Sequence, residues 1–329
     1  MTLNVRRRCL AALASTLLAK ALPAGAQARA QPARISWMSL STSADGSPFL
    51  ATLRQALRDI GHAEGRNLVI DTFWGEDSDE RIGSLLAELL ASRPQVIVAH
   101  GPAAIPLQRV TRTVPIVFGF SGDPVEAGLV DSFAHPGRNL TGLSFVAKQL
   151  AGKRIELIKE ALPQLRHLAV LASPQHPGDQ AERRESQVAA AALGLTLSIF
   201  EARGAAQIDS ALVAIEQSNC QAVVAFPVQN VLRMRTQMAA WSVRTRVPVV
   251  SGWAQFAEGG NLMTYGANLQ ASSQRLAEYV DKILKGANPA DLPVEFPTRM
   301  ELVVNLAAAK ALNIKLPYSV LLRADRIIE

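Results

Sequence analysis

Residues 114–143 read VPIVFGFSGDPVEAGLVDSFAHPGRNLTGL, and this stretch decides the fold. Its apolar beginning predicts a buried strand from Pro115 to Phe118 that breaks at Gly119. A helix is then predicted to begin at Asp123-Pro124, because aspartate caps backbone N–H groups and proline suits the first helical position. A strand that leads through a polar turn to a helix N-terminus is typical of ligand sites in open α/β sheets, at the carboxyl ends of their strands.

The rest of the chain alternates the same two patterns. Near-continuous apolar runs predict strands buried on both faces, as in parallel sheets covered by helices. The alternation runs through the chain twice, and VPIVFG at 114–119 is matched by VPVVSG at 247–252, so two similar α/β halves are expected. The segment 288–297 contains three prolines and predicts an extended connector.

The first 28 residues predict a secretory signal peptide. Three arginines (6–8) precede an apolar run at 9–19, and small-x-small cleavage sites follow at 24–26 and 26–28. The apolar run is too short for a membrane span. The mature chain is therefore expected in the periplasm, exported by the Sec route or, given the paired arginines, by the Tat route.

Removal of the signal peptide also changes the charge of the chain. The net charge is +6 for the full sequence, but 30 basic and 28 acidic residues remain in a chain that begins near Gln27. No basic block with interleaved aromatic residues is left, so nucleic-acid binding is not expected. Cys220 is the one cysteine that remains after cleavage, so an internal disulfide is excluded. We expect its side chain to be a small buried apolar group.

Enzyme signatures are missing from the sequence. It contains no G-x-S-x-G elbow, no G-x-x-x-x-G-K loop, no G-x-G-x-x-G after the first strand and no H-E-x-x-H. The five histidines stand at unrelated spacings, which predicts surface or turn positions, and only His100 ends a predicted strand, where a cleft could form. We therefore expect no catalytic residues, no metal site and no cofactor.

Small and polar residues follow nearly every predicted strand. This inventory suits a small polar ligand that is held by hydroxyl and backbone N–H groups beside one or two aromatic walls. The candidate ligand-binding residues are Ser41, Thr42, Gly101, Ala103, Ser121, Asp123, Gln175, Gln229, Trp253 and Tyr265.

Several of these candidates have a structural alternative. Asp123 is first a helix cap, and contact with a ligand ammonium group is its second role. Ser41 and Thr42 either solvate a turn or bind a carboxylate at the following helix N-terminus. Trp253 and Tyr265 are either aromatic walls of a ligand site or ordinary core residues.

Longer stretches resemble one family of proteins. They are GDPVEAGLV (122–130), PGRNLTGLS (136–144), AGKRIELIKEALP (151–163) and the closing LLRADRIIE (321–329). The chain resembles solute-binding proteins of a bacterial ABC-transporter family with the type I periplasmic-binding-protein fold, in the group that binds tryptophan or has no assigned solute.

The resemblance implies a definite architecture. Two Rossmann-like lobes with parallel sheets are joined by a multi-stranded hinge, which the chain crosses near 140–145, near 263–266 and in the proline-rich connector. The implied boundaries are 1–28 for the signal peptide, 34–142 plus 266–293 for the N-terminal lobe, and 143–265 plus 294–329 for the C-terminal lobe.

The resemblance also implies a function. The protein would be the periplasmic solute-binding component of an ABC importer, a monomer that closes over a small polar solute, with an amino acid as the first choice. Its partners would be the importer's permease and ATPase subunits. Two alternatives stay open: a ligand sensor that acts on a receptor or histidine kinase, and an exported hydrolase. A transcriptional regulator of this fold is not expected, because it needs N-terminal DNA-reading helices and the predicted signal peptide occupies that position.

Overall fold

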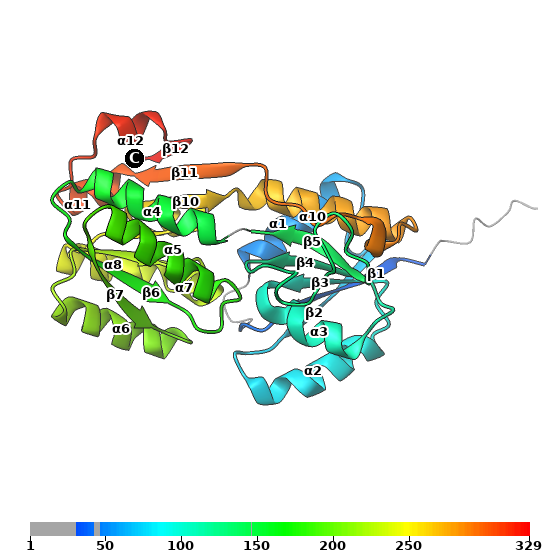
Figure 1. The fold of residues 1–329 in the computed structure, drawn as a ribbon. Coiled ribbons are helices and arrows are strands. Elements are labelled where there is room, and N and C mark those ends of the chain that lie inside the picture. Colours follow the sequence, from blue (N-terminus) through cyan, green and yellow to red (C-terminus); the bar gives the residue numbers. More distant parts are fainter. Residues whose placement is uncertain (1–30, 43–46, 146) are drawn as a thin grey trace, which may run out of the picture. The chain divides into compact units, whose positions relative to one another are not determined.

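Two β-sheets organise the protein (Figure 1). The computed structural model describes residues 31–42, 47–145 and 147–329, and the predicted signal peptide lies outside these ranges. Residues Ala33–Glu329 form one unit. We call the five-stranded sheet with its helices the first lobe, and the seven-stranded sheet with its helices the second lobe. None of the helices in the described ranges has both the length and the apolar character that a membrane span requires.

The first lobe is a parallel sheet with helices on both faces. Its strand order is β2-β1-β3-β4-β5. The strands are β1 (Ala33–Ser39), β2 (Leu68–Trp74), β3 (Val96–His100), β4 (Ile116–Phe120) and β5 (Leu140–Ser144). Helices α1 (Pro48–Asp59) and α10 (Leu269–Leu284) cover one face, and α2 (Asp79–Ala91) and α3 (Ala104–Val110) cover the other (Figure 1).

Strand β3 shows why its sequence is an uninterrupted apolar run. Val96 and Val98 pack in the hydrophobic cluster that contains α1 and α10, whereas Ile97 and Ala99 pack in the cluster that contains α2 and α3. Successive side chains of a strand point to opposite faces, and both faces of this sheet are covered. Each residue of β3 up to Ala99 is therefore buried.

The second lobe contains a mixed sheet of order β12-β11-β10-β9-β8-β6-β7, in which only the β10–β11 pair is antiparallel. Its strands are β6 (His167–Ala172), β7 (Thr196–Glu201), β8 (Ala222–Ala225), β9 (Val249–Ser251), β10 (Met263–Ala267), β11 (Met300–Asn305) and β12 (Arg326–Ile328). Its helices are α4 (Ala147–Ala161), α5 (Asp179–Ala192), α6 (Ala205–Gln217), α7 (Gln229–Arg233), α8 (Arg235–Thr245), α9 (Ala254–Glu258), α11 (Leu306–Ala311) and α12 (Tyr318–Leu322). The predicted fold class, two α/β lobes with parallel sheets, is confirmed.

The chain passes between the two sheets three times. It crosses after β5, again between β10 and α10, and a third time between α10 and β11. The last crossing runs beside β5, where the Glu295 N–H donates to the Gly142 carbonyl at 3.0 Å and the Ser144 N–H donates to the Glu295 carbonyl at 2.9 Å. The residue boundaries of the lobes given above stay a prediction.

One hydrophobic cluster contains side chains of both lobes. From the first lobe it includes Leu53 of α1 and Val280 of α10, and from the second lobe Ile208 of α6 and Met238 of α8. Burial of apolar side chains stabilises the fold by about 1.5–3 kcal/mol for each large residue. This shared cluster therefore stabilises the two lobes together as well as separately.

Two expectations for the segment after β4 are wrong. The strand continues through Gly119 to Phe120 instead of ending there. No helix begins at Asp123: its Oδ1 does accept the Val125 N–H at 2.8 Å, as a cap would, but the chain forms only a turn. Gly128 takes a φ of 69°, which reverses the chain before a second helical turn.

Candidate ligand-binding site

A cavity of about 350 Å³ lies at the carboxyl ends of strands from both sheets. This volume is in the range of small-molecule sites, roughly 300–1,000 Å³. The residues that line it follow nine different strands: Ser41 after β1, Asp77 after β2, Gly101-Pro102 after β3, Ser121 after β4, Phe145 after β5, Ser173 and Gln175 to Pro177 after β6, Arg203 after β7, Pro227 to Asn230 after β8, and Trp253 after β9. Both lobes thus contribute to one cavity, as the position of loops in open α/β sheets predicts.

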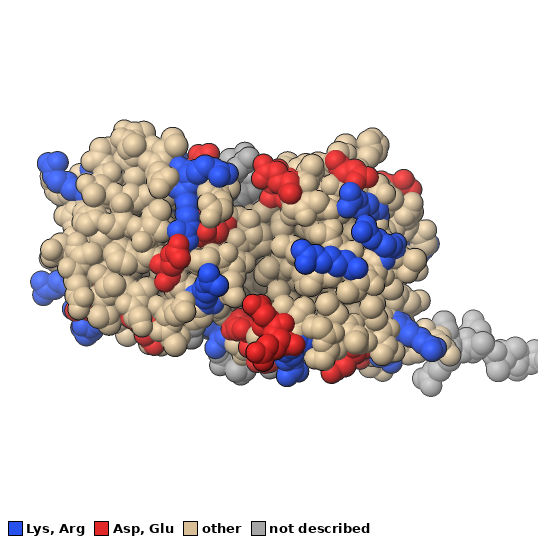
Figure 2. Space-filling model, turned by 60° about the horizontal axis from the view of Figure 1, so that its bottom comes forward, with Lys and Arg blue, Asp and Glu red and all other residues tan. Residues whose placement is uncertain are grey.

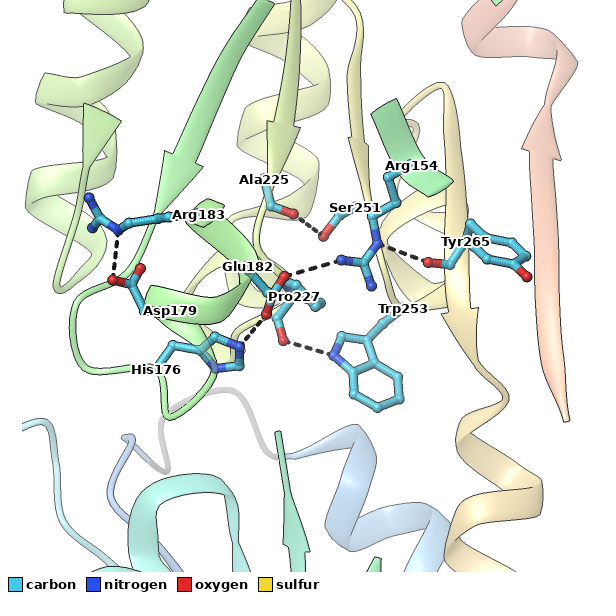
Figure 3. Close-up of polar contacts among 10 residues, drawn as sticks. All are labelled: Arg154, His176, Asp179, Glu182, Arg183, Ala225, Pro227, Ser251, Trp253 and Tyr265. Carbon is cyan, nitrogen blue, oxygen red and sulfur yellow. Dashed lines mark hydrogen bonds and ion pairs between the residues drawn. The ribbon is translucent and has the colours of Figure 1, made fainter. Parts of the chain in front are cut away.

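Three rings form an aromatic wall of the cavity: Phe49, Phe145 and Trp253. The Trp253 ring meets Phe49 at a centroid distance of 5.0 Å and Phe145 at 5.3 Å, both edge to face. Its Nε1–H donates to the Pro227 carbonyl at 3.0 Å (Figure 3). Because this bond satisfies the only polar atom of the indole, the wall offers apolar surface to a ligand.

His100 adjoins the aromatic wall at the end of β3. Its ring lies 4.3 Å from that of Phe49 and stacks on Trp37 at 5.3 Å, measured between centroids. Burial among these rings lowers the pKa of His100 to about 4, because the imidazolium ion loses its hydration there. The side chain is therefore neutral at physiological pH and adds no charge to the cavity.

The low pKa of His100 predicts a pH dependence of stability. Its pKa is about 6.5 in an unfolded chain, so the unfolded state takes up a proton below that pH and the folded state does not until about pH 4. Stability is therefore fully present above pH 6.5 and falls as the pH drops, by about 2–3 kcal/mol over this window. Urea unfolding of the wild type and of His100→Phe at pH 7.5 and 4.5 should show a smaller loss in the variant. Equal losses would contradict the assignment.

A buried ionic network adjoins the cavity. It consists of Arg154, Glu182 and His176, and we call it the Glu182 network. Glu182 Oε2 lies 3.3 Å from Arg154 Nη1, and Glu182 Oε1 lies 2.6 Å from His176 Nε2 (Figure 3). The Arg154 side chain is 2% exposed and that of Glu182 is fully buried. Burial lowers the pKa of Arg154, and the charge of Glu182 opposes this effect.

The Glu182 network connects several elements of the second lobe. Arg154 belongs to α4 and Glu182 to α5, while His176 lies in the β6–α5 loop and lines the cavity. Arg154 Nε also donates to the Tyr265 carbonyl in β10 at 2.9 Å. The network therefore fixes the cavity-lining loop relative to the strand from which the chain crosses to α10.

Two amide side chains of α7 also line the cavity. Gln229 is only 9% exposed, and neither of its amide atoms has a hydrogen-bond partner among the described residues. The same holds for Asn230 Oδ1, although its Nδ2 donates to the Arg203 carbonyl at 3.1 Å. Asp77 of the first lobe hydrogen-bonds the Asn230 side chain, and burial raises the pKa of this carboxyl group.

The sequence of the chain matches a known family over most of its length. Residues 48–328 match the family described as ABC transporter substrate binding protein. The chain belongs to this family. The predicted family is thereby confirmed, and the structural neighbours of this substrate-binding protein have the type I periplasmic-binding-protein fold.

Individual relatives agree with this assignment. A tyrosine-binding protein of Clostridioides difficile (strain R20291) is 22% identical over 272 residues, which cover 79% of this chain and 75% of that protein. A conserved domain protein of Vibrio cholerae O1 biovar El Tor strain N16961 has a TM-score of 0.80 and 28% identity, covering 90% of this chain and 100% of that chain. The ABC domain of Streptococcus pneumoniae in complex with L-Trp has a TM-score of 0.80 and 23% identity, covering 91% and 100%.

The substrate-binding protein brings six of the ten predicted site residues to its cavity: Ser41, Gly101, Ser121, Gln175, Gln229 and Trp253. The other four, Thr42, Ala103, Asp123 and Tyr265, do not line this cavity. Ala103 is fully buried, and the Tyr265 carbonyl is bonded to Arg154. Contact between any of the ten residues and a solute stays a prediction.

Some lining residues were absent from the predicted set. Phe49 and Phe145 are apolar residues near the start of α1 and after β5, and their sequence context does not distinguish them from core residues. His176 does stand in a turn, as expected, but it is buried and paired with Glu182. Asn230 follows Gln229 directly, so the strand-end rule that selected Gln229 could have included it.

The charged side chains of Asp77, Asp79 and Arg203 line the cavity. On the face shown in Figure 2, basic and acidic side chains are interspersed. In the part of the chain that the structure describes, no group of three or more His, Cys, Asp or Glu side chains could hold a metal ion. Cys220 is buried, which raises the pKa of its thiol and makes it a poor nucleophile, in agreement with its predicted role as a small hydrophobe.

Proposed function

We propose that this substrate-binding protein is the periplasmic component of an ABC importer and delivers an aromatic amino acid to the permease. The N-terminal signal peptide would direct its export, and the importer's ATPase would drive the transport step. The protein acts by binding alone, as a monomer and without a cofactor.

The aromatic wall supports this choice of solute more than any other feature. Three rings line a cavity of about 350 Å³ whose remaining lining includes hydroxyl, amide and backbone groups. Such a site suits a solute with one flat apolar end and one polar end. The relatives give independent support, because one is a tyrosine-binding protein and the structure of another contains L-Trp.

The same wall suggests how the solute favours closure. Phe49 belongs to the first lobe, Trp253 to the second, and Phe145 lies where the chain first crosses between them. A ligand shifts a conformational equilibrium only through contacts that differ between the two states. A solute ring that packs on the touching Phe49–Trp253 pair contacts both lobes at once only when the lobes are closed, and the closed form then docks on the permease.

Thermal unfolding with a panel of solutes tests this function. The full gene is expressed in a bacterium, and the protein is purified from the compartment to which it is delivered and sequenced at its N-terminus. L-Trp, L-Tyr or L-Phe should raise the melting temperature by several degrees, because a ligand at a hundred times its Kd stabilises the native state by about 2.7 kcal/mol.

D-Trp and L-Ala serve as matched control solutes. D-Trp has the same ring and the opposite configuration, and L-Ala has the same head group without a ring, so both should shift the melting temperature less. A shift caused by sugars or nucleosides and by none of the three aromatic amino acids would refute the proposed solute. An intact N-terminus on a cytoplasmic product would refute the periplasmic role.

A further inference from the structure

The Gln229 side chain is buried at the cavity without a hydrogen-bond partner. It is 9% exposed, and both Oε1 and Nε2 lack a partner among the described residues. An unpaired amide group in an apolar environment costs about 1–3 kcal/mol on the scale of protein mutations. Because Gln229 lines the cavity, a rotation of its side chain would bring the unpaired amide to a ligand that supplies the missing partners.

Three other buried polar side chains around the cavity are already paired. Glu182 is bonded to Arg154 and His176, the Trp253 Nε1–H is bonded to the Pro227 carbonyl, and the Ser41 hydroxyl lies 2.8 Å from the hydroxyl of Ser39. Gln229 differs from these groups because it has one donor and one acceptor that are both unused. The Oδ1 atom of the neighbouring Asn230 is a second unused acceptor.

These atoms match the head group of an amino acid. An α-ammonium group donates hydrogen bonds and an α-carboxylate accepts them, and the two groups are attached to the same carbon atom. A single carboxamide can bond to both, because its oxygen accepts and its nitrogen donates. Asp77, which is bonded to the Asn230 side chain, adds a carboxyl group to the cavity lining beside these atoms.

We propose that Gln229 is the residue that reads the amino-acid head group of the solute. Its Oε1 accepts from the ammonium group, with Asn230 Oδ1 as a second acceptor, and its Nε2 donates to the carboxylate. This inference rests on the proposed function, since it requires an amino acid as the solute. It assigns specificity for the zwitterion to Gln229 and specificity for the ring to the aromatic wall.

Calorimetric titration of the wild type and of Gln229→Met with three probes tests the assignment. The probes are L-Trp, tryptamine, which lacks the carboxylate, and indole-3-propionate, which lacks the ammonium group; the corresponding tyrosine set replaces them if L-Tyr is the solute that binds. Hydrogen bonds to charged groups are the stronger kind, so L-Trp should bind the variant about tenfold to a hundredfold more weakly. Each analogue should lose a smaller factor, because it has lost one of the two contacts already.

Gln180→Met is the matched control. Gln180 is exposed on helix α5 and does not line the cavity, so its replacement should leave the affinity for L-Trp within about twofold of the wild type. Without ligand, Gln229→Met should melt at or above the temperature of the wild type, because methionine removes an unpaired buried amide. A structural role for Gln229 would instead lower this temperature.

Several results would overturn the assignment. Wild-type affinity of Gln229→Met for L-Trp would exclude a contact with the head group. A loss confined to one of the two analogues would exclude the assignment of both contacts to one amide. Failure of the wild type to bind L-Trp, L-Tyr and L-Phe would instead refute the proposed function, so the two failures are distinguishable.

Discussion

Replacement of Glu182 by alanine is expected to lower the free energy of unfolding by about 3–5 kcal/mol, the usual cost of removing one partner of a buried ion pair. The loss is large because Arg154 is 2% exposed and would keep its charge in an environment that provides little hydration. His176 would lose its bond to the same carboxylate. Chemical denaturation of the ligand-free protein, followed by circular dichroism, measures this difference.

Glu185→Ala is the control for this experiment. Glu185 lies on the same helix as Glu182 but is exposed, so its replacement should change stability by no more than about 0.5 kcal/mol. Similar losses in both variants would show that helix α5 is sensitive to any alanine. They would contradict a special role of the Glu182 network.

Replacement of Gly142 by alanine is the second change with a large expected effect. Gly142 has a φ of 146°, and a Cβ atom there would lie 2.0 Å from the carbonyl oxygen and 2.6 Å from the nitrogen of Phe118. These are backbone atoms of the neighbouring strand β4, and they cannot rotate away as the atoms of a side chain could. Strain and overpacking each cost about 1–3 kcal/mol, so we expect a total loss of about 2–6 kcal/mol in unfolding free energy.

Gly152→Ala is the control, and it is expected to raise the unfolding free energy instead of lowering it. This glycine is in the interior of α4, and an added Cβ would meet only the Ala189 methyl group at 3.6 Å, an ordinary contact. Alanine at such a position stabilises a helix by roughly 0.5–1 kcal/mol. If Gly142→Ala unfolds at the same denaturant concentration as the wild type, the close approach of β4 and β5 described here is wrong.

The fold could be predicted from the sequence wherever local and tertiary signals agree. The apolar runs at β3, β4 and β6 predict buried parallel strands, because both faces of the sheets are covered. The signals disagree after β4. Asp123-Pro124 is a good helix start, but the chain must turn at Gly128 toward β5, and Arg138 bonds the Gly128 carbonyl at 2.7 Å. Tertiary packing therefore overrides the local preference.

The site was predicted in part for a similar reason. The rule that ligands bind at strand ends selects Ser121, Gln229 and Trp253, and all three line the cavity. The rule says nothing about apolar residues, so it misses Phe49. It also misses the Arg154–Glu182 pair, because these residues are 28 positions apart on two helices and meet only when the helices pack.

The three crossings between the sheets have a consequence for genetic dissection of the protein. Helix α10 covers the first sheet although it follows β10 of the second, and β11 and β12 then return to the second sheet. No single cut in the gene therefore separates the lobes: a fragment that stops after β10 lacks a helix of one lobe and two strands of the other. A self-contained single lobe requires joining distant coding segments with a new linker.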